Sequence, residues 1–233
     1  MKKAFTLSEV LITLSVVGIV AVLTVPGVMK NYQNKLYTAQ LQKVYSQIAE
    51  ATKAMMNDEH VDNFYETSII TGSCNEEGVC SNPGVGYFLS NYFKNTKNNC
   101  GGTCTMYGDD DYKSLTGTSI AGGLGGHSCS QTASGATICG VLNRAIGGDN
   151  SRKCLSLTVD VNGLSQPNVT GRDIFAMDIH DDGSVSDYGS GCMDGSMGMA
   201  ASKCPEYTEG EALMKAAGGC LNKIIDDGWK MEY

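Results

Sequence analysis

The order of apolar and polar residues divides the first 57 residues into two parts. Residues 5–29 are almost all apolar, and Glu9 is the one charged residue among them. A helix of about 25 residues extends about 37 Å, which is enough to cross the apolar core of a membrane. We therefore predict that residues 5–29 form a helix that is apolar on every side.

Residues 30–57 show apolar positions at spacings of three and four. This spacing predicts an amphipathic helix with one face available for packing. The positions on that face are Tyr37, Leu41, Val44, Ile48, Ala51 and Met55. Together the two segments predict one long helix, whose first half meets lipid or other helices and whose second half carries a folded head.

Strands are predicted further along the chain. Apolar and polar residues alternate in residues 155–161, and residues 174–180 and 184–187 predict two more strands around a hairpin turn at Asp182 and Gly183. A long helix followed by strands predicts an α+β fold, with the helix packed on a small antiparallel sheet.

The remaining segments are less regular. Residues 86–94, 209–217 and 221–225 predict short helices, and residues 136–142 predict one further strand. Residues 100–148 contain 12 glycines and four cysteines, so we expect long, disulfide-rich loops with little regular structure there.

The cysteines point to an oxidising compartment. The chain has ten of them, all after residue 73, and such a density is typical of exported domains with disulfides. Short loops favour the pairs Cys74–Cys80, Cys100–Cys104 and Cys129–Cys139, but spacing does not fix the connectivity. We expect the other four in disulfides as well: Cys154, Cys192, Cys204 and Cys220. Zinc is the alternative, and it is disfavoured because no C-x2-C pair is present.

The charge disfavours nucleic acid as a partner of the head. The net charge is −8 and the head has no run of Lys or Arg, so its surface should repel phosphate. The motifs of common hydrolases and nucleotide-binding enzymes are also absent, and His60, His127 and His180 are isolated in the sequence. We therefore expect a protein that is not an enzyme.

Three alternatives exist for the N-terminal segment. A secretory signal peptide would need an A-x-A cleavage site after the apolar run, and residues 24–28 do not offer one. An uncleaved anchor fits the length and the two lysines at positions 2 and 3, which favour a cytoplasmic N-terminus. It does not explain Glu9, because an unpaired carboxylate is costly in lipid.

The third alternative rests on a resemblance. Residues 2–10, with the sequence KKAFTLSEV, resemble the processing site of type IV prepilins and type II secretion pseudopilins. The resemblance implies that a prepilin peptidase cuts between Ala4 and Phe5 and methylates the new amine of Phe5. It also implies that Glu9 acts in assembly and that Pro26 ends the apolar run. Ala4 departs from the pattern, since glycine is usual before the cut.

The chemistry of such a cut gives Glu9 a role. Cleavage creates a positive amine at Phe5, and the carboxylate of Glu9 in a neighbouring subunit could pair with it and set the register. The alternative is a protonated Glu9 in a plain anchor. Pro26, followed by Gly27, should kink or locally open the helix. The alternative is an ordinary bend at the membrane boundary, which could have the same residues.

A second resemblance lies in the head, where residues 160–175 are similar to a segment of some prepilin-type proteins. Some pseudopilins bind calcium in a loop of the head, and Asp160, Asn162 and Asp173 would supply hard oxygen ligands. A second candidate set lies at Asp178, Asp181 and Asp182. The alternative is that Asp, Asn and Gly here only form turns.

These inferences give an organisation and a function as expectations. Residues 1–4 would be the leader, 5–29 the membrane and filament-core segment, 30–57 the amphipathic segment, and 58–233 the disulfide-rich head. The resemblance implies a structural subunit of a type IV pilus, a type II secretion pseudopilus or a related DNA-uptake filament. Its partners would be other pilin subunits, the prepilin peptidase, the assembly platform with its ATPase, and membrane lipid before assembly.

The expected location follows from the same resemblance. The subunit would lie in the bacterial inner membrane as a single-pass protein, with its head in the periplasm or extracellular space, and would end in a cell-surface filament. Two alternatives remain: a membrane-anchored extracellular adhesin or binding module with an uncleaved N-terminus, and an anchored exported enzyme whose site has no sequence motif.

Overall fold

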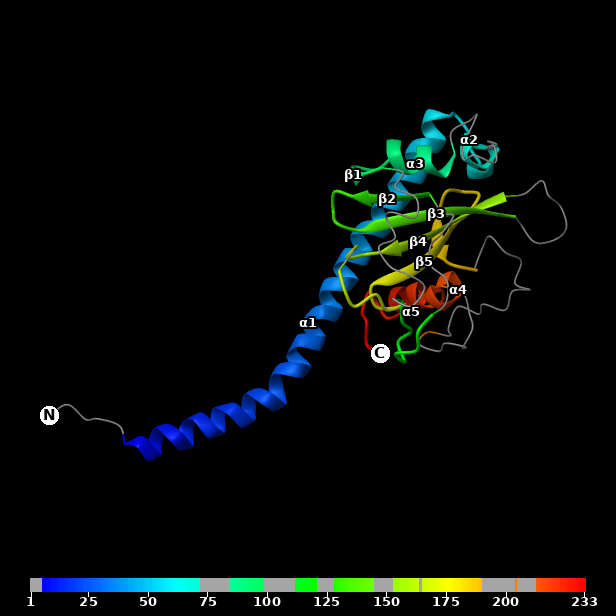
Figure 1. Cartoon of the computed structure of the whole chain (residues 1–233). Coiled ribbons are helices and arrows are strands. Elements are labelled where there is room, and N and C mark those ends of the chain that lie inside the picture. The colour runs from blue at the N-terminus through cyan, green and yellow to red at the C-terminus, as the bar shows by residue number, and fades with distance from the viewer. Residues whose placement is uncertain are drawn as a thin grey trace.

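The computed structural model describes residues 6–71, 84–98, 112–120, 128–144, 153–163, 165–189, 204 and 213–233. One long helix, α1 (Leu7–Asp58), carries a head on its second half, while its first half projects away from the head (Figure 1). The other helical segments are short: η1 (Phe64–Glu66), α2 (Ser68–Thr71), α3 (Val85–Asn91), α4 (Leu213–Ala217) and α5 (Cys220–Asp226).

The head is built on an antiparallel sheet of six strands, which follow one another in space in chain order. The strands are β1 (Asn95–Lys97), β2 (Ser128–Thr132), β3 (Thr137–Arg144), β4 (Lys153–Asp160), β5 (Ile174–Ile179) and β6 (Val185–Asp187). In the centre of the sheet, Val159 of β4 lies between Ile138 of β3 and Phe175 of β5. The predicted α+β fold, with a long helix on an antiparallel sheet, is confirmed.

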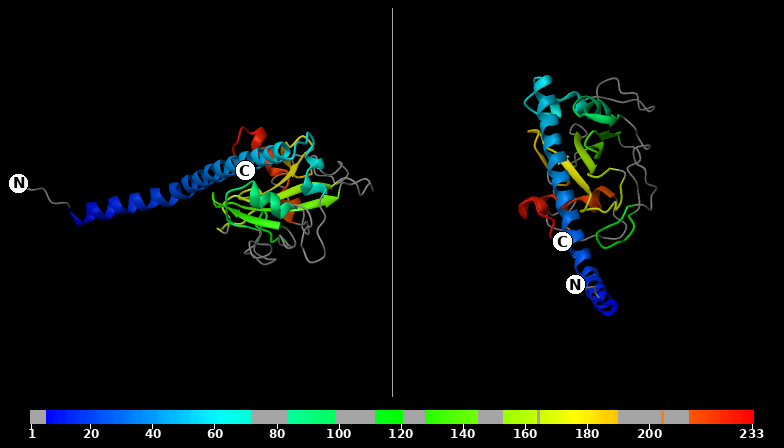
Figure 2. Two further views of the ribbon diagram at one scale, coloured as in Figure 1. Left: turned by 90° about the horizontal axis from the view of Figure 1, so that it is seen from above. Right: turned by 90° about the vertical axis from the view of Figure 1, so that its left-hand side faces the viewer.

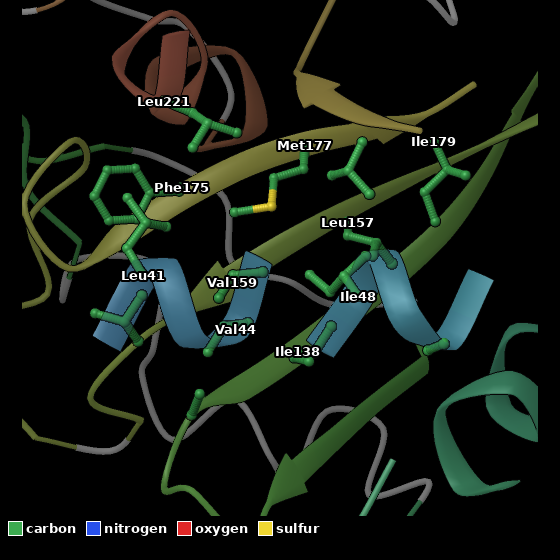
Figure 3. Close-up of a cluster of buried hydrophobic side chains, with 14 of the residues drawn as sticks. Leu41, Val44, Ile48, Ile138, Leu157, Val159, Phe175, Met177, Ile179 and Leu221 are labelled. Carbon is green, nitrogen blue, oxygen red and sulfur yellow. The ribbon is translucent and has the colours of Figure 1, made fainter. Parts of the chain in front are cut away.

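Side chains alternate between the two faces of the sheet along each strand, and each face is covered by a helix. Phe175, Met177 and Ile179 of β5 face α1, where Leu41 and Ile48 pack against them and their neighbours (Figure 3). The intervening side chains point to the opposite face and form a second core with α4. This second core contains Tyr112, Ile120, Cys129, Cys139, Ile174, Ala176, Leu213 and Ala217.

The prediction for α1 agrees with the structure in detail, since every position of the predicted packing face is buried. Three polar residues share that face and were not predicted. Asn34 donates to the Met231 carbonyl at 2.9 Å, Thr52 donates to the Gly183 carbonyl at 2.8 Å, and Thr38 donates to the Asn34 carbonyl. These hydrogen bonds satisfy polar groups that burial would otherwise leave unpaired.

The expectation of long loops in residues 100–148 was wrong for residues 128–132, which form β2, whereas the strand expected at residues 136–142 is present as β3. The two strands form a hairpin, and β3 extends beyond the expected strand. The sequence of β2 is SCSQT, which has no apolar alternation, yet Cys129 and Ser130 are buried by the neighbouring strand and the second core. The strand therefore depends on contacts with its neighbours rather than on its own pattern.

The last residues of the chain return to α1. Trp229 packs edge-on against Tyr45, with ring centroids 5.5 Å apart, and Tyr233 donates to the Gly171 carbonyl. Together with the bond between Asn34 and Met231, these contacts fasten the C-terminal segment beside the helix. Both Figure 1 and Figure 2 place this segment at the end of the head nearest the projecting half of α1.

Candidate functional site

The projecting half of α1 is apolar and uncovered. From Thr6 to Gln33 the side chains are exposed, apart from a half-buried Ala21. Among the described residues, α1 is the one helix whose length and composition would allow it to cross a membrane. An apolar surface of this size on a protein marks a place where lipid or another protein binds. Over residues 7–29, the prediction of a membrane-type helix is therefore supported by length, composition and exposure.

The first turn of α1 contains a capping box, in which a side chain at each end of the turn bonds the backbone of the other. Glu9 Oε2 accepts from the Thr6 backbone N–H at 2.8 Å and from the Thr6 hydroxyl at 2.7 Å. The Glu9 backbone N–H in turn donates to the Thr6 hydroxyl at 3.3 Å. A carboxylate here also meets the positive end of the helix dipole.

One oxygen of Glu9 remains available. Both bonds to Thr6 use Oε2, and Oε1 accepts no hydrogen bond from any residue that the structure describes. The carboxylate can therefore cap its own helix and still bind a cation through Oε1. Ala4 and Phe5, the predicted processing residues, lie outside the described residues.

Pro26 lies inside α1, and the helix continues through it without a break. The first part of α1 and its continuation run in different directions, and this bend lies within the exposed half (Figures 1 and 2). A proline removes one backbone donor and is a common cause of such a bend. The bend agrees with the predicted kink, whereas the alternative of a locally opened helix is not observed.

Asp160 and Asp173 lie together in the head, as the calcium hypothesis requires. Asp173 is fully buried and Asp160 nearly so. Burial, and next the nearby charge of Asp173, raises the pKa of Asp160 well above its usual range. Burial also raises the pKa of Asp173, although its oxygens accept from the N–H groups of Asn168 at 2.9 Å and Val169 at 2.6 Å.

Two asparagines near this acidic pair have buried amide atoms without hydrogen-bond partners. Asn162 Oδ1 is buried with no hydrogen-bond partner, and so are both side-chain atoms of the fully buried Asn168. The Asn162 amide also lies close enough to Tyr37 and Asp173 to affect the pKa of both. Sequence reasoning found Asp160, Asn162 and Asp173, but it missed Tyr37, which α1 contributes from far away in the chain, and Asn168.

The oxygen atoms of this cluster are suitable ligands for a hard cation. Two buried carboxylates beside each other repel, and buried oxygens without partners are the ligands that calcium prefers. No group of three or more Asp, Glu, His or Cys side chains suited to a metal occurs in the described part of the chain, so amide and backbone oxygens would have to complete the shell. Asp160, Asp173 and Asn162 are the residues that would hold the ion.

The other candidate set does not come together. Asp178 is buried and bonds within the head, where it accepts from the Ser156 hydroxyl at 2.6 Å and from the Gly189 N–H at 2.7 Å. Asp181 and Asp182 are exposed in the β5–β6 turn, and Asp182 accepts from the Ser184 N–H at 2.8 Å. The turn-forming alternative accounts for these contacts.

A further buried acid was not found by sequence reasoning. Asp187, at the end of β6, accepts from the N–H of Gly219 at 2.8 Å and of Asn222 at 2.8 Å, so it caps the start of α5. Burial raises its pKa to about 6. A lone Asp at a strand end gives no signal of this role, because the groups it binds are about thirty residues away.

Two disulfides are described. Cys129 and Cys139 face each other across β2 and β3, with a Cα–Cα distance of 4.0 Å, as the short-loop prediction requires. Cys204 and Cys220 form a second bond that fastens α5, at a Cα–Cα distance of 4.8 Å. Cys74, Cys80, Cys100, Cys104 and Cys192 lie outside the described residues, and so do the two other predicted pairs. Cys154 lies in β4.

One histidine is less isolated than the sequence indicated. His180 Nε2 lies 2.6 Å from the Ser186 hydroxyl across the β5–β6 hairpin. This contact links the two strands of the hairpin next to an exposed turn.

Comparison of the chain with known protein families, with curated proteins and with solved structures finds no significant match. Its function must therefore be argued from its own residues.

Proposed function

We propose that this protein is a pilin-like structural subunit, which is cut between Ala4 and Phe5 and assembles into a filament through the first half of α1. The observation that carries the proposal is the division of α1 into an exposed apolar half and a half that is packed on the head. A helix of this kind can lie in a membrane and later replace its contacts with lipid by contacts with the same helix of neighbouring subunits.

The position of Glu9 supports assembly rather than simple anchoring. A carboxylate in an apolar segment needs a compensating charge or hydrogen bonds. Thr6 supplies hydrogen bonds to Oε2, which leaves Oε1 to meet the amine that cleavage would create at Phe5 of a neighbouring subunit. Such a pair would fix how far one helix is displaced along the next.

The head supports an exported, outward-facing role. It packs only on the second half of α1, so a bundle of first halves would leave every head on the outside. Its two described disulfides are those of a protein that matures in an oxidising compartment, such as the periplasm. Other subunits, a prepilin peptidase and a membrane assembly platform would be its partners.

N-terminal mass spectrometry of the membrane-extracted protein tests processing. The proposal expects a chain that begins with N-methylated Phe5. A chain that keeps residues 1–4 would overturn it and would favour an anchored adhesin or binding module with the same helix.

Two matched variants test the role of Glu9. Glu9→Gln keeps a side chain that can cap the helix but removes the charge, and Thr6→Val removes the cap but keeps the charge. The proposal expects Glu9→Gln to abolish incorporation into filaments while the head stays folded, and Thr6→Val to assemble. Normal assembly of Glu9→Gln would refute the pairing of charges. Loss of assembly in Thr6→Val alone would show that only the helix cap matters.

A further inference from the structure

A groove lies where α1 leaves its apolar half. It is formed on one side by the first turns of the packed half of α1 and on the other by the C-terminal segment, residues 229–232. Its volume is about 420 Å³, which lies within the range of small-molecule sites. The buried Asn34, bonded to the Met231 carbonyl, joins the two sides.

The groove begins on α1 just beyond the end of the apolar block, where the edge of a membrane would lie if that block spans it. The apolar block ends at Met29, and Lys30 and Lys35 follow about 1.5 Å and about 9 Å further along the axis. The headgroup layer on each side of a bilayer core is about 5–8 Å thick. If residues 5–29 span the core, the entrance of the groove lies among the lipid headgroups.

The lining of the groove is positively charged, although the protein as a whole is acidic. The net charge is −8, yet the helix from Val10 to Ala49 contains three lysines and no acid. Lys35 of α1 and Lys230 of the C-terminal segment line the groove, and Glu232 is the one acid in its lining. No carboxylate of a described residue lies within ion-pair distance of Lys30, Lys35 or Lys230.

We propose that this groove binds the phosphate headgroup of an anionic phospholipid before the subunit assembles. The ammonium groups of Lys35 and Lys230 would meet the phosphate from opposite sides, and the side-chain amide of Asn31 would donate to its oxygens. The long lysine side chains can keep their charges in the headgroup layer. The inference rests on the membrane-anchoring part of the proposed function, and it needs neither the cut at Phe5 nor a filament.

A single tryptophan provides the test. Trp229 is the one tryptophan of the chain and lines the groove. The full chain is reconstituted in vesicles of phosphatidylcholine with a minor fraction of phosphatidylglycerol. Two vesicle preparations have the same composition and the same amount of brominated lipid, but the bromine is carried on phosphatidylglycerol in one and on phosphatidylcholine in the other. Flotation of the chain with the vesicles is measured first.

We expect quenching of Trp229 to be about fivefold stronger when phosphatidylglycerol carries the bromine. The two lysines and Glu232 give the groove lining a net charge of +1, and one positive charge near a membrane surface attracts anionic lipid by about that factor. Lys35→Gln with Lys230→Gln should make the two preparations equal. Lys30→Gln, on the same helix at the membrane edge but outside the groove lining, should leave the preference unchanged, and Glu232→Gln should increase it.

The results that would contradict these expectations can be told apart. A chain that does not float with vesicles overturns the membrane anchor and therefore the proposed function. A chain that floats but is quenched equally by both lipids, or by neither, overturns the lipid site alone. Equal loss of preference in Lys30→Gln and in the double variant would show a diffuse charge effect and would also overturn the site. Unchanged near-ultraviolet circular dichroism verifies that each variant is folded.

Discussion

Leu41→Ala should loosen the head from α1, and Leu36→Ala is its matched control. Both residues are leucines of the same helix, but Leu41 is completely buried in the contact with the sheet, whereas Leu36 is 42% exposed. The first substitution removes apolar atoms from the contact and leaves a cavity between α1 and β5. The second removes the same atoms from a place where water already reaches them.

The sizes of the two effects differ accordingly. A fully buried leucine costs about 2–5 kcal/mol on truncation to alanine, whereas an exposed side chain costs about 0.5 kcal/mol or less. A loss of about 3 kcal/mol lowers the midpoint of thermal unfolding by about 6–12 °C in a domain of this size. Leu36→Ala should change it by no more than about 2 °C.

Thermal unfolding of the full chain in detergent micelles measures the difference. Trp229 packs against Tyr45 of α1, so its fluorescence reports directly on the contact between head and helix. If Leu41→Ala and Leu36→Ala lower the midpoint equally, α1 is not held by the buried leucine, and the proposed division of the helix into a free half and a packed half is wrong.

Three further predictions concern the head. Burial raises the pKa of Asp187 to about 6, from about 3.9 in the unfolded chain. Its contribution to stability should therefore be full below pH 4 and be lost as the pH rises through 6. Asp187→Asn should flatten this decline in the unfolding midpoint. Gly140→Ala should destabilise by about 1–3 kcal/mol in chemical denaturation, since the new Cβ would lie 2.5 Å from Val85 Cγ1; an unchanged midpoint would contradict that contact. Calcium at a hundredfold excess over its dissociation constant should stabilise the protein by about 2.7 kcal/mol, and an equal gain in the double variant Asp160→Asn, Asp173→Asn would exclude this site.

The sequence predicted the parts of the fold whose pattern is local. The packing face of α1 follows from apolar spacing within one helix, and its six predicted positions are all buried. Strand β4 was predicted from its alternation of apolar and polar residues, and β4, β5 and β6 all lie within a residue or two of their predicted bounds. The short-loop pair Cys129–Cys139 was predicted for the same reason, because its partners are near each other in the chain.

Features that depend on distant partners could not be predicted. The polar strand β2 is held by its neighbours in the sheet, and Asn34 is buried only because Met231 receives its hydrogen bond. In the acidic cluster the sequence supplied Asp160 and Asp173, which lie in one short segment, but Tyr37 comes from α1. Periodicity within a segment carries no information about which remote segment will cover it.

The ties between α1 and the head have a mechanical consequence. The packed half of the helix is fastened at its start by Asn34 to Met231, and near its end by Thr52 to Gly183. Just beyond the helix, Phe64 donates to the Asp181 carbonyl at 2.6 Å. No strand of the sheet is a direct continuation of α1, so a pull along the helix axis does not peel one strand from the next. If the protein is pulled by its helix, as the proposed function requires, the force would therefore be distributed over the whole contact between helix and sheet, and the head would follow as one unit.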